Sequence, residues 1–256
     1  MATLLAAGSA HAQEPDGTMV FARIASWQIA RPNWDAYEAD QKKTQVPILD
    51  KLMADGVITE YGLVRNTVHT PDGYTHVTWY SSKTLAGLEK ALAAIVEADA
   101  KLPTAERRRS VTDFAGSKHS DNIARSRVIK GGTKKLSSGY MYVSIDVVQP
   151  GKGAGYTERL EQIVRPALGP LVTDGSLVSY GVDTEYVHTA DPGVRTMWMV
   201  LAAADALDKL DAAQRSMNRS AGAAERESMA QTWRETVVSS AHRDELWEIY
   251  GYASKY

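Results

Sequence analysis

The spacing of hydrophobic positions changes along the chain in a fixed order, and that order occurs twice. Residues 20–29 (VFARIASWQI) and 141–148 (MYVSIDVV) have strand-like patterns rich in branched and aromatic side chains. In the first copy a helix-like stretch opens near residue 33 and ends at Asp55-Gly56. Glycine at that point favours the left-handed conformation that closes many helices. Each copy is therefore predicted to begin with a strand and a helix.

A hairpin, a second helix and a last strand complete each copy. Residues 57–68 and 74–81 are strand-like and flank a turn at Thr70-Pro71-Asp72-Gly73, where Asp-Gly accepts the backbone angles of a tight turn. Residues 85–98 and 203–217 are predicted helices, and the closing strands are 123–129 and 246–253. The order β-α-β-β-α-β is that of the ferredoxin-like unit.

A shift of 119 positions superimposes the two copies. YGLVRNTVHT (61–70) matches YGVDTEYVHT (180–189), and Asp55-Gly56 matches Asp174-Gly175. The duplication predicts a first repeat at residues 19–129 and a second at residues 140–256. The segment between them, residues 130–139 (KGGTKKLSSG), has the composition of a flexible, exposed linker.

Both faces of the predicted strands carry apolar side chains. Tyr61 and Leu63 alternate with Ile58 and Val64, a pattern that a sheet covered on both sides requires. The helices of a ferredoxin-like unit cover one face only, so the other face must meet a second sheet. We therefore predict an α+β protein in which the antiparallel sheets of the two repeats pack into an intramolecular pseudo-dimeric α/β barrel.

The duplicated β-α-β-β-α-β order and the long hairpin resemble the dimeric α/β-barrel superfamily in a tandem, single-chain form, over residues 20–256. The resemblance implies that two sheets close into a barrel, with small ligands between the sheet and helices of one unit or near the barrel mouth. Members include cofactor-independent monooxygenases, isomerases and cyclases, haem enzymes such as chlorite dismutase, and proteins of no known activity. The fold alone therefore implies no particular reaction.

Composition removes several classes of protein. The chain has 256 residues, a formal net charge of −2 and no cysteine. A near-neutral charge argues against broad binding to nucleic acid or to an anionic membrane. The lack of cysteine excludes disulfides, thiolate catalysis and Cys-ligated metal, and no apolar run approaches the ~20 residues that span a bilayer. We expect a small-molecule partner, and either a monomeric pseudo-dimer or a higher homo-oligomer.

The N-terminal sequence predicts export. A short apolar segment leads into Ala10-His11-Ala12, an A-x-A pattern that resembles the end of a secretory signal peptide cleaved after Ala12. Residues 1–18 are expected to be the remnant of that peptide and a tail, which would make the protein periplasmic or secreted in a bacterium. The alternative is an N-terminal tail without a targeting role.

Two histidines mark the hairpin turns. His69 and His188 each end a predicted strand and precede a threonine. One interpretation is a general base or a ligand-binding group at a cavity rim. The other, which we favour from the sequence, is that each histidine organises its turn by local hydrogen bonds.

Two further histidines form pairs with aspartate. His119-x-Asp121 and His242-x-Asp244 lie between a helix and the last strand of each repeat, where residues i and i+2 project to one side. The carboxylate can orient the imidazole, or both groups can bind a metal. A histidine near a helix C-terminus is also favoured by the helix dipole alone, so these four residues are weak metal candidates.

Residues at which the repeats differ predict a pocket. Arg23 and Trp27 share one face of the first strand, and His76 lies on the hairpin. A charge on a two-sided sheet must pair, reach solvent or line a cavity. The three residues predict a pocket for a planar or anionic ligand, with His76 or His69 as the base and Arg23 stabilising developing negative charge. The alternative is a structural ion pair between Arg23 and Asp146 across the barrel.

The remaining candidates for ligand binding are aromatic or basic strand residues. Tyr142 and Arg195 replace Arg23 and His76 in the second repeat. Trp79 and Trp198 occupy matching strand positions, where core packing is favoured over a pocket wall.

Three classes of function are compatible with these residues. The first is an enzyme without a bound organic cofactor that oxygenates, isomerises or cyclises an apolar or aromatic compound. The second is a non-catalytic ligand-binding or assembly protein, and the third is a haem or metal protein that uses one of the histidines. No cofactor is predicted, and haem or a metal stays an alternative. Serine-hydrolase, zincin and dinucleotide-binding motifs are all lacking, so those enzyme classes have no support in the sequence.

Overall fold

The structure is a computed structural model that describes residues 18–68, 73–104, 118–186 and 193–256. The expected signal-peptide cleavage site after Ala12 lies outside these ranges, and so do His69 and His188. The predictions made for these residues stay predictions.

The first repeat has the predicted order of elements. These are β1 (Thr18–Trp27), the 3-10 turn η1 (Arg31–Asn33), α1 (Trp34–Ala54), β2 (Glu60–Asn66), β3 (His76–Ser82), α2 (Leu85–Lys101) and β4 (His119–Lys130). Gly56, with φ of 72°, follows α1 and confirms the left-handed cap. Thr84 caps the start of α2, where its hydroxyl accepts the Gly87 N–H at 3.0 Å.

The second repeat follows the same order. Its elements are β6 (Gly139–Val147), α4 (Gly153–Arg159), the π-helical segment η3 (Leu160–Val164), α5 (Arg165–Thr173), β7 (Leu177–Glu185), β8 (Val194–Leu201), α6 (Asp205–Ser220), α7 (Ala223–Thr236), the 3-10 turn η4 (Ser239–Ala241) and β9 (Arg243–Ser254). The connecting segment 130–139 contains a short strand, β5 (Lys134–Leu136), which pairs with the last residues of β9. Its composition did not predict this strand, because the pairing depends on an edge that β9 offers from the far end of the chain.

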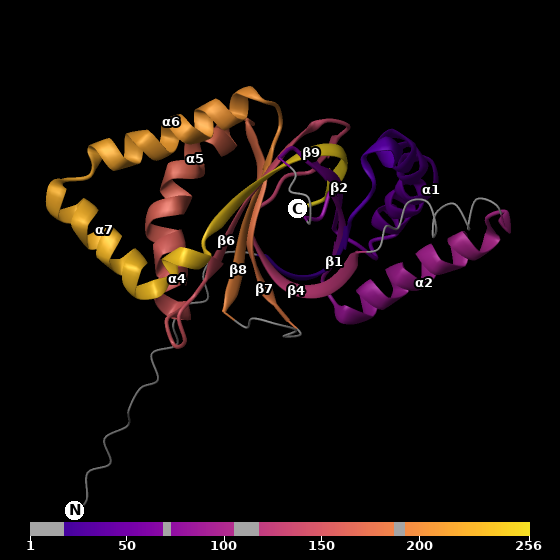
Figure 1. Ribbon diagram of the computed structural model, residues 1–256, viewed down its shortest axis with the longest axis horizontal. Helices are drawn as coiled ribbons and strands as arrows, with labels where there is room; N and C mark the ends of the chain where they lie inside the picture. Colours follow the sequence, from indigo (N-terminus) through magenta and orange to yellow (C-terminus); the bar gives the residue numbers. More distant parts are fainter. Residues whose placement is uncertain (1–17, 69–72, 105–117, 187–192) are drawn as a thin grey trace, which may run out of the picture.

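Eight of the nine strands in the described residues close a barrel, and the two repeats meet edge to edge. Each repeat contributes a four-stranded antiparallel sheet, in the orders β2-β3-β1-β4 and β7-β8-β6-β9, and β4–β7 and β2–β9 pairing joins them. Figure 1 shows α1 and α2 on one outer side of the barrel and α4 to α7 on the opposite side. The predicted intramolecular pseudo-dimeric α/β barrel is therefore confirmed.

Alternation along the strands separates an inner from an outer face. Two hydrophobic cores lie between helices and sheet, around Leu49 and Tyr61 in the first repeat and around Leu168 and Tyr180 in the second. A third apolar cluster faces the barrel interior and includes Val20, Val64, Val143, Trp79, Trp198 and Trp247. None of the described helices is long and apolar enough to cross a membrane.

Candidate functional site

The barrel interior holds a cavity of about 890 Å³, within the range of small-molecule sites. Side chains from all eight barrel strands line it. Val68 is part of the lining and is 75% exposed, so the cavity opens beside the β2–β3 hairpin. We call this the open end. The other end, the closed end, is at Glu60, which pairs in register with Ser81 and Ser254 and is 2% exposed.

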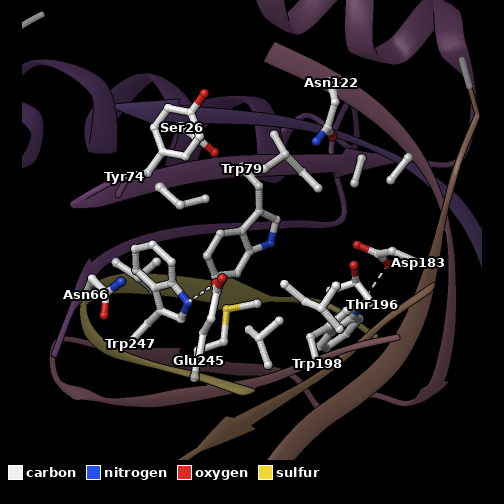
Figure 2. Close-up of a pocket in the computed structure, with 18 of the residues that line it drawn as sticks. Ser26, Asn66, Tyr74, Trp79, Asn122, Asp183, Thr196, Trp198, Glu245 and Trp247 are labelled. Carbon is white, nitrogen blue, oxygen red and sulfur yellow. Dashed lines mark hydrogen bonds between the residues drawn. The ribbon is translucent and has the colours of Figure 1, made fainter. Parts of the chain in front are cut away.

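Three tryptophans stand in the cavity wall, and glycines make room for two of them. Trp79 on β3 lies opposite Gly62 of β2, and Trp198 on β8 lies opposite Gly181 of β7. A Cβ atom at either glycine would overlap the facing indole ring. Trp247 on β9 is the third indole in the wall (Figure 2). The two glycine–tryptophan pairs are related by the 119-residue repeat, so the duplicated sequence builds this part of the wall twice.

Carboxylates anchor the indoles. The Trp198 indole N–H donates to Asp183 Oδ1 at 2.8 Å, and the Trp247 indole N–H donates to Glu245 Oε2 at 3.2 Å (Figure 2). Because the N–H edge of each ring is held by a carboxylate, the ring orientation is fixed. The wall thus combines flat aromatic surface with acidic groups.

Glu60 is the most deeply buried acid of the cavity wall. Tyr252 Oη donates to Glu60 Oε1 at 2.6 Å, and Ser179 Oγ lies 2.7 Å from the same tyrosine oxygen. Burial raises the pKa of Glu60 to about 7; hydrogen bonds from Tyr252 and Trp79 oppose this, and the nearby charge of Asp183 adds to it. Glu60 is therefore poised to gain or lose a proton near neutral pH.

Asp183 is the second perturbed acid. Asp183 is half-buried and is one of the residues that line the cavity. Burial raises the pKa of Asp183 to about 6, against the hydrogen bonds from Ser126 and Trp198. The repeat-equivalent of Glu60 is Ser179 and that of Asp183 is Val64, so each repeat supplies one acid and the pseudo-symmetry is broken here.

His76 lies on the opposite face of the barrel wall, beneath α1, with no exposed surface. Its Nε2 is 3.5 Å from Glu38 Oε1, and its Nδ1 is 3.0 Å from Thr75 Oγ1. The rings of Trp34 and Tyr37 pack edge-on against the imidazole. Burial lowers the pKa of His76 in spite of the neighbouring Glu38 carboxylate. A neutral imidazole enclosed in this way is a packing and hydrogen-bonding group.

Arg65 completes the cluster around His76. It bonds Glu38 Oε1 at 3.0 Å and Glu248 Oε2 at 2.5 Å, and so ties α1 to β2 and β9. The pKa of Glu38 is low, because His76, Arg65 and Lys42 together outweigh the effect of burial, which would raise it. The cluster joins the two repeats on the outside of the barrel.

Arg23 and Trp27 also face outward, away from the barrel cavity. Arg23 Nη2 lies 3.2 Å from Asp121 Oδ2, and Trp27 stacks on His119 with ring centroids 3.8 Å apart. Trp27 is the register partner of His76, but neither they nor Arg23 are among the residues that line the cavity. The alternative prediction of an Arg23–Asp146 pair is wrong, since Arg23 and Asp146 lie in different repeats on the outer face and each has its own partners.

Asp146 instead belongs to a cluster in the second repeat. Its carboxylate accepts from Tyr156 Oη at 2.9 Å and pairs with His242 Nδ1 at 2.8 Å. His242 Nε2 in turn lies 3.4 Å from Asp244 Oδ2. Neighbouring carboxylates thus orient the imidazole through both ring nitrogens.

The fit to a metal or to haem is poor in the described residues. His119 Nε2 lies 3.5 Å from Asp121 Oδ1, but within the described ranges no group of three ligating side chains could hold a metal ion. Of the described histidines His76, His119 and His242, none is found among the cavity-lining residues. The described residues that line the cavity therefore supply no axial histidine for haem.

Sequence reasoning identified part of this wall. Trp79, Trp198 and Tyr142 line the cavity, whereas Trp27 and Arg195 are not among the lining residues. The residues that it missed are chiefly Glu60, Asp183 and Trp247. A signal was present: both acids stand in strands of a sheet covered on two faces, where a charge must pair or line a cavity.

No family model and no curated protein matches the chain. Solved structures match over nearly its whole length. A presumed monooxygenase from Fusobacterium nucleatum subsp. nucleatum has a TM-score of 0.64 and 9% identity, and covers 93% of this chain and 95% of its own. A presumed monooxygenase from Lactobacillus acidophilus has a TM-score of 0.58 and 12% identity, and the match covers 93% of this chain and 96% of that protein. An anthrone oxidase-like protein has a TM-score of 0.50 and 11% identity, and the match covers 93% of this chain and 94% of that protein.

These similarities define the class of protein by its fold. The chain has the dimeric α/β-barrel fold in its fused form, with both halves in one polypeptide. At identities this low the likeness concerns the fold alone, and function has to be argued from the site.

Proposed function

We propose that the protein binds a planar aromatic small molecule inside the barrel and that Glu60 exchanges a proton with this molecule. The observation that carries the proposal is a cavity of about 890 Å³ that combines three tryptophans with a buried carboxyl group near half-ionisation at neutral pH. Flat indole faces favour flat aromatic partners, which stack with an offset or pack edge to face.

Polar groups of the cavity wall support the proposal that a ligand binds in a defined orientation. Asn122 lines the cavity, and its side-chain Oδ1 is buried and has no hydrogen-bond partner among the described residues. Buried polar atoms in native structures are nearly always satisfied, so a donor on the ligand or on an ordered water is expected there. Few convergent polar groups in a largely apolar wall are typical of small-molecule sites.

The chemistry we propose is acid–base catalysis on an aromatic carbon acid. Oxygenation, isomerisation and cyclisation of such compounds can all begin with the removal of a proton next to a carbonyl group. A carboxylate whose pKa is near the working pH suits that step. The names of the similar structures, two presumed monooxygenases and an anthrone oxidase-like protein, agree with this reaction class.

Binding is tested by filling the cavity. Ala124 is 4% exposed and lines the interior on β4, whereas its neighbour Arg125 faces outward. Anthrone binding is measured under nitrogen by quenching of tryptophan fluorescence in the wild type, Ala124→Phe and Arg125→Phe. We expect the inward phenylalanine to weaken binding at least tenfold and the outward one to leave it unchanged. Equal affinities in all three proteins would contradict the proposed site.

Proton transfer is tested with Glu60→Gln, which keeps an acceptor for Tyr252 and removes the base. In air, anthrone and O2 would give anthraquinone and water. We expect the variant to form anthraquinone about 100-fold more slowly or worse, because a general base contributes about 10²–10⁴-fold, while anthrone affinity changes less than threefold. A variant as fast as the wild type would remove Glu60 as the base. Binding without turnover in the wild type would identify a non-catalytic binding protein.

A further inference from the structure

The cavity wall has a strong excess of acidic groups. Among the described residues that line it, the carboxyl groups are Glu60, Asp183, Glu185, Asp244 and Glu245, and the one basic side chain is Arg243. Arg243 Nε bonds Glu245 Oε1 at 3.1 Å, so that guanidinium is already paired. The charge of this cavity wall is therefore opposite in sign to that of the cationic pocket that the sequence predicted around Arg23.

The excess of acidic groups includes side chains that lie deep in the barrel, away from solvent. Glu60 lies at the closed end, and Asp183 pairs in register with Ser126 and Thr196 in the barrel wall. The partners of both acids are neutral: Tyr252 and Trp79 for Glu60, Ser126 and Trp198 for Asp183. Burying a carboxylate without a counter-ion is unfavourable. A positive charge supplied from the cavity would offset that cost.

The aromatic wall favours the same charge. A cation over the face of tryptophan, the best partner among the aromatic side chains, is attracted by the ring quadrupole, and the attraction grows when solvent is excluded. Trp79, Trp198 and Trp247 all border the cavity, with Trp198 and Trp247 held by carboxylates at their N–H edges. Indole faces and acidic groups therefore act together.

We infer that the barrel cavity selects an organic cation, a protonated amine carried on a planar apolar body, with Glu60 and Asp183 as its anionic anchors. The inference rests on the proposed function, because it takes the barrel interior as the ligand site. A neutral ring of the same shape keeps the stacking but leaves the acids uncompensated. An anion of that shape meets carboxyl groups at the closed end and along the wall, and is repelled.

The test uses three tricyclic probes of similar size and different charge. At pH 7.5, 9-aminoacridine is a cation, 9-anthracenemethanol is neutral and anthracene-9-carboxylate is an anion. Their affinities are measured by calorimetry for the wild type and for Glu60→Gln, Asp183→Asn and the double variant. Both substitutions keep the hydrogen-bond acceptors for Tyr252 and Trp198. Ala124→Phe reports whether each probe occupies the cavity, and thermal unfolding verifies that each variant is folded.

The expected result is that the wild type binds the cation at least tenfold more tightly than the neutral probe, and the anion most weakly. The double variant should lose that tenfold preference while its affinity for the neutral probe changes less than threefold. Cation binding should also release protons, about a quarter of a proton from Glu60 at pH 7.5, seen as a dependence of the binding enthalpy on the buffer. Glu60→Gln should remove this release.

Two other outcomes are distinguishable. If the neutral or anionic probe binds as tightly as the cation, and Ala124→Phe weakens its binding, the inference of cation selectivity is wrong and the barrel site stands. If Ala124→Phe leaves the binding of all three probes unchanged, or none binds, the barrel interior is not the ligand site, and the proposed function fails together with the inference.

Discussion

The raised pKa of Glu60 predicts how the free energy of unfolding depends on pH. Burial raises this pKa from the ordinary 4.5 to about 7, so the folded protein holds a proton that the unfolded chain releases. The sign follows: the contribution of Glu60 to stability is fully present below pH 4.5 and is lost as the pH rises to 7. Glu60→Gln cannot ionise and does not show this loss.

The magnitude follows from the two pKa values. A difference of one pH unit corresponds to 1.36 kcal/mol, so the complete loss is about 3 kcal/mol. Between pH 5 and pH 8 the expected loss is about 2.5 kcal/mol, because the unfolded carboxyl is already mostly ionised at pH 5. In a chain of this size that loss lowers the melting temperature by roughly 5–10 °C.

The assay is urea unfolding of the ligand-free wild type and Glu60→Gln at pH 5 and pH 8, with thermal scans in parallel. We expect the stability of the variant relative to the wild type to increase by about 2.5 kcal/mol between the two pH values. Glu97→Gln is the control: Lys101 Nζ bonds that surface carboxylate at 2.7 Å and holds its pKa below the ordinary value, so removing it does not raise the stability at pH 8. A difference between Glu60→Gln and wild type that is the same at both pH values would refute the reasoning.

Three further substitutions test the packing of the wall, an exposed glycine of α5 and the outer cluster. Gly62→Ala places a methyl group against the Trp79 ring and should lower the free energy of unfolding by about 1–3 kcal/mol, with a shift in tryptophan emission. Gly169 is exposed within α5 and has open space around it, so Gly169→Ala should raise the free energy of unfolding by about 0.5–1 kcal/mol. Arg65→Met leaves Glu38 without its guanidinium partner and should cost about 2 kcal/mol in urea unfolding, less than a fully buried pair because Arg65 is 26% exposed. An unchanged midpoint for Gly62→Ala or Arg65→Met would contradict these contacts.

Much of the fold could be predicted from local patterns. The sequence predicted that the first helix ends at Asp55-Gly56, and the φ of 72° at Gly56 confirms this end. The His-x-Asp pairs also have the predicted arrangement, with the two side chains of each pair close together. These features depend on residues close in the chain, so their periodicity is visible in one sequence.

The duplication made it possible to predict the whole barrel as well. Apolar residues on both faces of a strand, found in two copies of one unit, required a second sheet, and the edge pairing of β4 with β7 and β2 with β9 provides it. The repeated Gly62–Trp79 and Gly181–Trp198 pairs belong to the same reasoning, although only the structure shows that each glycine lies beneath its tryptophan.

The location of the site depended on tertiary structure. Arg23 and His76 share an outward face, and their charged partners, Asp121 and Glu38, come from distant segments. Glu60 and Asp183 come from different repeats and from positions that the 119-residue shift does not relate, yet the charge of Asp183 helps to raise the pKa of Glu60.

The sequence by itself determined the duplicated order of helices and strands and the alternation of inner and outer positions, because both repeat with short periods along the backbone. Only barrel closure decided which side chains meet across the interior and how much volume they leave open. That volume is the difference between the space inside a ring of eight strands and the side chains that fill it, and no local stretch of residues specifies either quantity.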